Sequence, residues 1–155
     1  MSKTDFVVDK DNLEVRITRV FNCSPERLYK AHTTREDLEQ WWENTKVDKL
    51  ELRVGGAWRF VSQGEMNGKP MAFRGEFKEI DEPRKIVRTF EFEPIPGHVM
   101  TESVIFEPVG DNQTRQITVS KFANVEDLNG MVAMGMSEGA ESGLDRLAKV
   151  VEGGN

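Results

Sequence analysis

The stretch VEDLNGMVAMGMSEGAESGLDRLAKVV, residues 125–151, is the one long segment of this chain with a sustained helical pattern. In its later part, apolar residues recur at steps of three or four, at Met136, Ala140, Leu144, Leu147 and Val151. This spacing places them on one face of a helix, while the charged residues between them face water. We therefore expect an amphipathic helix that covers an apolar surface elsewhere in the chain.

Glycines interrupt this helix at Gly130, Gly135, Gly139 and Gly143. Each mid-helix glycine costs roughly 0.5–1 kcal/mol relative to alanine, so their presence needs a reason. One interpretation is that the small residues let the helix pack closely against a neighbour. The other is that they form a loose, adaptable wall beside a pocket, together with the nearby methionines Met131, Met134 and Met136. A helix broken before about Gly135 is compatible with both interpretations.

The chain before this helix reads mainly as strands and turns. Residues 13–21 alternate as a half-buried strand, and two short helices follow, the first capped by Ser24 with Pro25 at its first position. Further strands are expected at residues 48–53, 57–63, 71–80, 84–92, 99–107 and 113–122. In the last of these strands, we expect Ile117 and Val119 to point inward.

Runs of strands flanked by helices indicate an α+β fold with an antiparallel sheet. We expect about seven strands that curve around the C-terminal helix, with space left between the helix and the inner face of the sheet. Such openings are where small-molecule sites form. Residues 1–155 show no repeat or linker and are expected to form a single domain. Residues 1–11 are either an N-terminal arm or the location of a short strand at residues 6–8.

Composition excludes several functions. The net charge is −6 and the chain has no basic cluster, so nucleic acid and anionic membranes are not expected partners. No apolar run approaches the roughly 20 residues that cross a bilayer, and no signal peptide is visible, so we expect a cytoplasmic protein that is a monomer or homodimer. His32, His98 and Cys23 lack metal-ligand spacing, and no cofactor or metal is predicted.

Aromatic residues supply most candidates for a ligand-binding wall. Trp41 and Trp42 are adjacent, so one is expected to pack and the other to cover the helix end or gate a cavity mouth. Others share the expected inward parity of their strands: Trp58, Phe60, Phe73, Phe77 and Phe90. In a fold of this kind the core wall and the cavity wall are one surface, so both readings remain open. Met131, Met134 and Ala140 complete the candidate set from the helix.

Arg88 lies on the same side of its expected strand as apolar residues such as Ile86 and Phe90, which is unusual for a charged side chain. Taking a charge out of water costs several kcal/mol, so a buried arginine needs a partner. Glu102 on the facing strand is the expected one. Arg88 is then either one half of a structural ion pair or an anchor for a ligand carboxylate or carbonyl.

The chain resembles a known family through several segments taken in order. They are residues 21–25, residues 38–42, residues 53–60 with Gly55-Gly56, residues 75–80, residues 82–87 and residues 135–147. These are similar to bacterial proteins related to the C-terminal domain of the Hsp90 ATPase activator Aha1, within the START-like, Bet v 1-like (SRPBCC) superfamily. The resemblance covers about residues 13–151. It implies the helix-grip fold and a mostly apolar cavity, and it implies no single function.

Two positions depart from the pattern of that family. An aromatic residue is common where His32 and Ala140 stand, and both changes remove bulk. Our leading hypothesis is non-catalytic binding of a small apolar or amphipathic molecule. One alternative is an interaction with a protein partner, with an Hsp90-type chaperone implied by the resemblance. The other is an enzyme of cyclase, dehydratase or hydrolase type that uses His32, Arg88 and Glu102.

Overall fold

The computed structural model describes residues 4–42 and 44–152. These residues form, in chain order, strands β1 (Asp5–Asp9) and β2 (Glu14–Phe21), helices α1 (Pro25–Thr33) and α2 (Arg35–Trp41), strands β3 (Thr45–Leu50), β4 (Ala57–Met66), β5 (Lys69–Asp81), β6 (Lys85–Phe92), β7 (Met100–Gly110) and β8 (Gln113–Lys121), and helices α3 (Val125–Ala133) and α4 (Met136–Glu152). The fold is α+β, as the order of the sequence patterns predicted.

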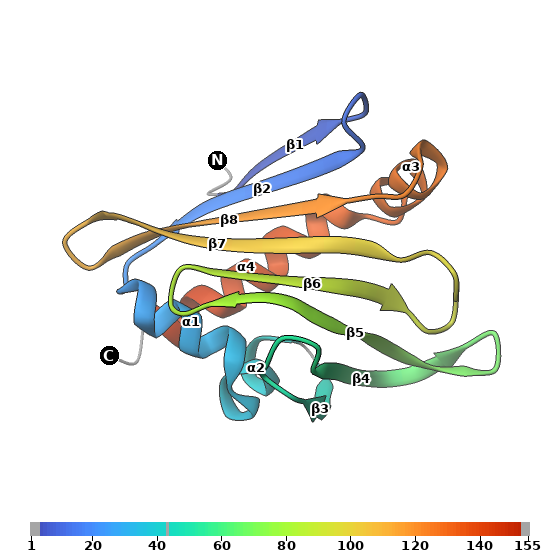
Figure 1. The fold of residues 1–155 in the computed structure, drawn as a ribbon, viewed down its shortest axis with the longest axis horizontal. Helices are drawn as coiled ribbons and strands as arrows, with labels where there is room; N and C mark the ends of the chain where they lie inside the picture. The colour runs from blue at the N-terminus through green and yellow to red at the C-terminus, as the bar shows by residue number, and fades with distance from the viewer. Residues whose placement is uncertain (1–3, 43, 153–155) are drawn as a thin grey trace.

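One antiparallel sheet contains all eight strands in the order β1-β2-β8-β7-β6-β5-β4-β3. The prediction of about seven strands is exceeded by β1, where residues 5–9 pair with β2 along the sheet edge. Register shifts interrupt the β3–β4, β4–β5 and β5–β6 pairs, and such bulges bend a sheet. The sheet therefore curves around α4, which crosses one of its faces (Figure 1).

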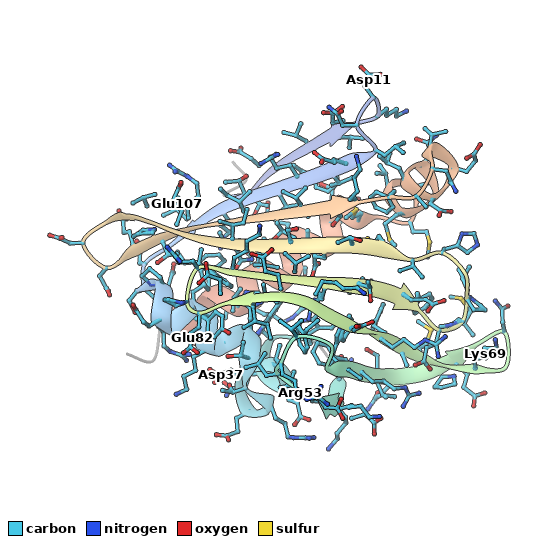
Figure 2. The ribbon with its side chains drawn as sticks, viewed as in Figure 1. Asp11, Asp37, Arg53, Lys69, Glu82 and Glu107 are labelled. Atoms are coloured by element: carbon cyan, nitrogen blue, oxygen red, sulfur yellow. The ribbon has the colours of Figure 1, made fainter. Side chains whose placement is uncertain are left out.

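Charged residues lie around the rim of the molecule (Figure 2). Glu107 and Lys69, for example, lie near opposite ends, beside the β7–β8 and β4–β5 hairpins. No helix among residues 4–42 and 44–152 is long and apolar enough to cross a membrane.

The inward face of β8 differs from the sequence prediction. Gln116 and Ser120 are buried, and Thr118 shares their parity, whereas Ile117 and Val119 are only partly buried on the opposite face. The prediction for Ile117 and Val119 was wrong because side chains alternate strictly along a strand, and the polar set takes the inner face here. Polar residues are tolerated inside when they find hydrogen-bond partners there.

The two short helices begin and pack as predicted. Ser24 caps α1 by accepting a hydrogen bond from the Arg27 backbone nitrogen at 3.1 Å, with Pro25 in the first turn. Thr34 is the N-cap of α2, but its side chain makes no capping bond. Leu28 and Leu38, at 0 and 1% exposure, anchor these helices in the core, because helices this short need tertiary packing.

The predicted long helix is divided into two. α3 ends at Ala133, and α4 begins at Met136 after Gly135 adopts a φ of +88°. The left-handed conformation at Gly135 ends α3 in the manner of a glycine C-terminal cap, with the Gly135 nitrogen donating to the Val132 carbonyl at 3.2 Å. The sequence pattern allowed a break before about Gly135 and did not require one.

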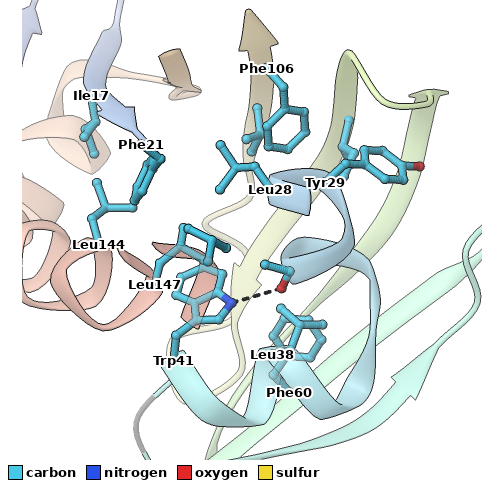
Figure 3. Packing of buried hydrophobic residues seen from close by; sticks show 14 of the residues in the cluster. Ile17, Phe21, Leu28, Tyr29, Leu38, Trp41, Phe60, Phe106, Leu144 and Leu147 are labelled. Atoms are coloured by element: carbon cyan, nitrogen blue, oxygen red, sulfur yellow. Dashed lines mark hydrogen bonds between the residues drawn. The ribbon is translucent and has the colours of Figure 1, made fainter. Parts of the chain in front are cut away.

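The hydrophobic core lies between the sheet, α1, α2 and the C-terminal half of α4 (Figure 3). Leu144, Leu147 and Val151 are buried, so the amphipathic face of this helix is confirmed. Trp41 joins the core with its ring nitrogen donating to the Ala31 carbonyl at 3.0 Å, the bond drawn in Figure 3. This core fixes α4 at one end and leaves its other end to border a cavity.

Candidate functional site

A cavity of about 330 Å³ lies between the inner face of the sheet and the N-terminal half of α4. Its wall comes from α1, α2, α4 and from strands β2 to β8. The apolar and aromatic lining residues are Ile17, Trp41, Trp42, Phe73, Val104, Gly139, Ala140, Gly143 and Leu144. The polar ones are His32, Thr45, Ser62, Arg88, Glu102, Gln116, Thr118 and Arg146.

Most of the lining surface is apolar, as the resemblance implied, and several polar side chains are set into it. Its polar residues come from β6, β7 and β8 on the inner sheet face and from the helices and edge strands around them. Sequence reasoning missed Gln116 and Thr118, because the apolar residues between them dominated the pattern of β8. Polar residues at every second position, Gln116, Thr118 and Ser120, could have indicated a polar inner face of this strand.

Three of the α4 residues that line the cavity, Gly139, Ala140 and Gly143, are very small. A Cβ added at Gly139 would meet no atom within 4 Å, and one added at Gly143 would meet only the Arg146 Nη2 at 3.9 Å. The interpretation that these glycines let the helix pack closely on a neighbour is therefore wrong. Gly139, Ala140 and Gly143 instead leave open space beside the helix.

Trp41 and Trp42 both line the cavity, although they are adjacent in sequence. This is possible because α2 ends at Trp41 and Trp42 already has an extended backbone. Trp41 is held by its hydrogen bond to Ala31. The ring nitrogen of Trp42 finds no acceptor among the described residues, and its ring rests edge-on against Phe60 and Phe73, with centroid distances of 5.0 and 5.7 Å.

Other predicted residues lie behind this wall. Trp58, Phe60 and Phe77 are 1, 0 and 2% exposed and belong to the core. Phe90 packs against Trp58 and Phe73 with ring centroids 5.4 Å away from each. Of the predicted aromatic set, the structure thus places Trp41, Trp42 and Phe73 at the cavity and the others in the layer that supports them.

The two predicted methionines are not part of the cavity lining. Met131 packs against the core from α3, and Met134, at the α3 terminus, is 63% exposed. The sequence prediction placed Met131 and Met134 in the same cavity wall as Ala140, within one helix over residues 125–151. The break at Gly135 redirects α3, so residues before it do not continue the face that Ala140 occupies.

Arg88 and Glu102 form the expected pair. Arg88 Nε and Nη2 lie 2.9 and 2.8 Å from Glu102 Oε1, and the two side chains are 9 and 15% exposed. The guanidinium also stacks over the Trp58 ring at 4.5 Å from its centroid. The pair satisfies the requirement that a buried arginine has a partner, and it places both charges in the cavity wall.

His32 finds a partner that the sequence did not show. Its Nε2 lies 2.7 Å from Gln116 Oε1, so the ring N–H donates to the amide oxygen. The pKa of His32 is lowered to about 4, mainly by burial; the Gln116 bond opposes this effect and the nearby Arg88 charge adds to it. His32 is therefore neutral near pH 7 and held in one orientation between Trp41 and Phe106.

The site brings together His32, Arg88 and Glu102, the three residues of the enzyme hypothesis. A general base is most effective when its pKa lies near the working pH, and burial takes His32 well below it. Burial also raises the pKa of the Cys23 thiol to about 11, which disfavours a nucleophilic role. Among the described residues, no group of three His, Cys, Asp or Glu side chains could hold a metal ion. The arrangement is suited to hydrogen bonding and packing.

A curved antiparallel sheet around a C-terminal helix, with a cavity between them, defines a Bet v 1-like domain of the START/SRPBCC type. The chain belongs to the family described as "Activator of Hsp90 ATPase homolog 1-like protein", which matches residues 22–152. The resemblance seen in the sequence is thereby confirmed.

Solved structures are similar along nearly the whole chain. Protein Ms6760 from Mycobacterium smegmatis is 25% identical with a TM-score of 0.85, over 97% of this chain and 98% of that one. A protein from Arthrobacter aurescens is 24% identical with a TM-score of 0.84, over 95 and 90% of the two chains. An Hsp90 activator from Plasmodium falciparum is 25% identical with a TM-score of 0.60, over 71 and 73%. No protein of curated function matches this chain significantly.

Proposed function

We propose that this protein binds a small amphipathic molecule in the cavity between the sheet and α4, without catalysing a reaction. The observation that carries the proposal is the 330 Å³ space whose α4 wall is kept open by Gly139 and Gly143. Glycines at these positions weaken the helix and make no close contact that would justify the cost. An open binding space is a reason for their presence.

The cavity size favours a compact ligand. Ligand pockets run from roughly 300 to 1,000 Å³, so this cavity is near the lower end of the range. Its aromatic side, formed by Trp41, Trp42 and Phe73, offers flat apolar surface. We expect a molecule of one or two rings, or a short chain, in preference to a two-chain lipid.

The experiment uses the uncharged fluorescent probe N-phenyl-1-naphthylamine, whose emission rises in apolar surroundings. Gly143→Leu fills the cavity from α4. Gly130→Leu adds the same side chain in α3, where a new Cβ meets no atom within 4 Å. We expect wild type and Gly130→Leu to bind the probe and Gly143→Leu to lose binding. A probe concentration 100 times Kd should also stabilise the fold by about 2.7 kcal/mol.

The proposal fails if wild type does not bind the probe, or if folded Gly143→Leu binds it as tightly as wild type does. Circular dichroism of the three proteins shows whether each variant is folded. The matched Gly130→Leu variant separates cavity filling from the general effect of a leucine in place of a helical glycine.

A second candidate function is interaction with an Hsp90-type chaperone. It is favoured by the family match over residues 22–152 and by the similarity to the Plasmodium falciparum Hsp90 activator. An ATPase assay with a purified bacterial Hsp90-type chaperone tests it. Stimulation of turnover by the added protein supports this candidate, and unchanged turnover together with failure to co-purify rejects it.

A further inference from the structure

The two charges on the sheet side of the cavity wall, Arg88 and Glu102, cancel each other. Arg88 makes both of its hydrogen bonds to Glu102 Oε1, and the planar face of its guanidinium rests on Trp58. Among the described residues, Arg88 is the only arginine that lines the cavity from the sheet, and Glu102 is paired with it. A ligand that approaches either charge meets the opposite charge at the same place.

The other two titratable groups that line the cavity, His32 and Arg146, lie on helices and not on the sheet. His32 is neutral near pH 7. Arg146 belongs to the α4 wall, where its Nε donates to the Trp41 carbonyl and its Nη1 to the Ser142 hydroxyl, each at 2.9 Å. A charged ligand group seated at the sheet would lose its hydration without gaining an unpaired counter-charge, and burying a charge in this way costs several kcal/mol.

Hydrogen-bonding capacity remains at the sheet side of the cavity. Arg88 Nη1 and Glu102 Oε2 make no hydrogen bond to the described residues. Neither atom is among the fully buried polar atoms that lack a partner. The Gln116 amide is bonded through its oxygen to His32, which leaves its nitrogen as a donor. Thr118, on the same face, offers a hydroxyl that donates or accepts. Donors and an acceptor are thus presented together.

We propose that the cavity selects an uncharged ligand whose polar end carries a hydrogen-bond donor and acceptor side by side, as a primary carboxamide or lactam does. The carbonyl of such a group accepts from Arg88 or Gln116, and its N–H donates to Glu102. The apolar body lies between the aromatic wall and the glycine wall of α4. This inference rests on the proposed function and adds the chemical class of the ligand.

Isothermal titration with matched probes near neutral pH tests the inference. The probes are 2-naphthamide, 2-naphthoate and 2-naphthylmethylammonium, which share a ring system and differ in the charge of the polar end. We expect 2-naphthamide to bind at least about tenfold more tightly than either ion, because a like charge held at a cavity wall costs more than 1.4 kcal/mol. Equal or tighter binding of an ion, or no binding of the amide, overturns the inference.

Glu102→Gln gives the sharper test. It removes the carboxylate, keeps the side-chain shape and leaves Arg88 unpaired, so the preference should reverse in favour of 2-naphthoate. Because an unpaired buried arginine can prevent folding, Arg88→Met with Glu102→Gln is the second variant. With both charges gone, 2-naphthamide should weaken by about tenfold and 2-naphthoate should not gain, since the charge-assisted bonds are lost. Unchanged selectivity in both variants contradicts the proposal.

The uncharged N-phenyl-1-naphthylamine probe distinguishes a wrong ligand class from a wrong proposed function. If it binds in the cavity while 2-naphthoate outcompetes 2-naphthamide, the inferred ligand class is wrong and the proposed function stands. If neither this probe nor any of the naphthalene probes binds, both are wrong.

Discussion

The two halves of α4 have the same helical spacing and different surroundings. In the C-terminal half, Leu147 and Val151 are buried in the core, whereas Ala140 and Gly143 in the N-terminal half border open space. Periodicity placed Ala140, Leu147 and Val151 on one side of the helix. What separates a packed surface from a cavity wall here is side-chain volume: large residues reach the sheet, and small ones do not.

The largest expected effect is the loss of a packed side chain from the C-terminal half. Leu147→Ala removes a side chain with 0% exposure and should cost about 2–5 kcal/mol of the free energy of unfolding. Met136→Ala, in the N-terminal half, should cost clearly less because its side chain is only partly buried against the core. Urea denaturation of both variants measures the difference, and equal costs would remove the distinction between the halves.

The next effect comes from His32, which touches the core at Phe106 and also lines the cavity. Its pKa is about 4 in the folded state and 6.5 ordinarily, so the unfolded chain takes up the proton first as pH falls. Stability from this group is present above pH 6.5, declines between 6.5 and about 4, and is constant below that. The full decline is roughly 3 kcal/mol, since one pKa unit corresponds to about 1.4 kcal/mol.

The measurement is the free energy of unfolding of wild type minus that of His32→Gln at a series of pH values. Glutamine does not titrate, and the carboxylates common to both proteins cancel in the difference. A difference that does not change across this pH range would mean that water reaches His32 in the folded protein and that its side chain is not buried.

The smallest expected effect is a gain. Gly143→Ala adds a methyl group to the cavity wall and should stabilise α4 by roughly 0.5–1 kcal/mol, because alanine is the better helix former and the new Cβ meets only the Arg146 Nη2 at 3.9 Å. Gly130→Ala in α3 is the control in open surroundings. Thermal unfolding should show a small rise for both variants, and destabilisation by Gly143→Ala would mean that the helix packs closely there after all.

Local patterns predicted the elements of the fold well. Ser24-Pro25 fixed the start of α1, and Gly135 fixed the break between α3 and α4, because each residue imposes a backbone geometry or a capping bond by itself. The inner face of β8 was missed. Parity arguments assume an apolar inside, and Gln116 is stabilised inside by His32, a residue 84 positions away in sequence.

The candidate site was predicted unevenly for the same reason. The Arg88–Glu102 pair follows from one odd charge on an apolar parity and a facing strand, so the sequence was sufficient. Which aromatics line the cavity was not predictable, since Phe60 and Phe73 are paired across β4 and β5 and both contact Trp42, a residue from a distant segment. Met134 left the predicted face when the chain turned at Gly135.

By itself, the sequence determined an α+β fold with a C-terminal amphipathic helix, the breaks at Pro and Gly, and the family to which the chain belongs. These depend on local backbone preferences and on periodicity, which are set by residues close together in the sequence. Only the tertiary structure decided where space remains and which polar groups face it. A cavity and its hydrogen bonds arise from side chains of distant segments that meet across it, as Gln116 of β8 meets His32 of α1 and Gly143 of α4 faces the sheet.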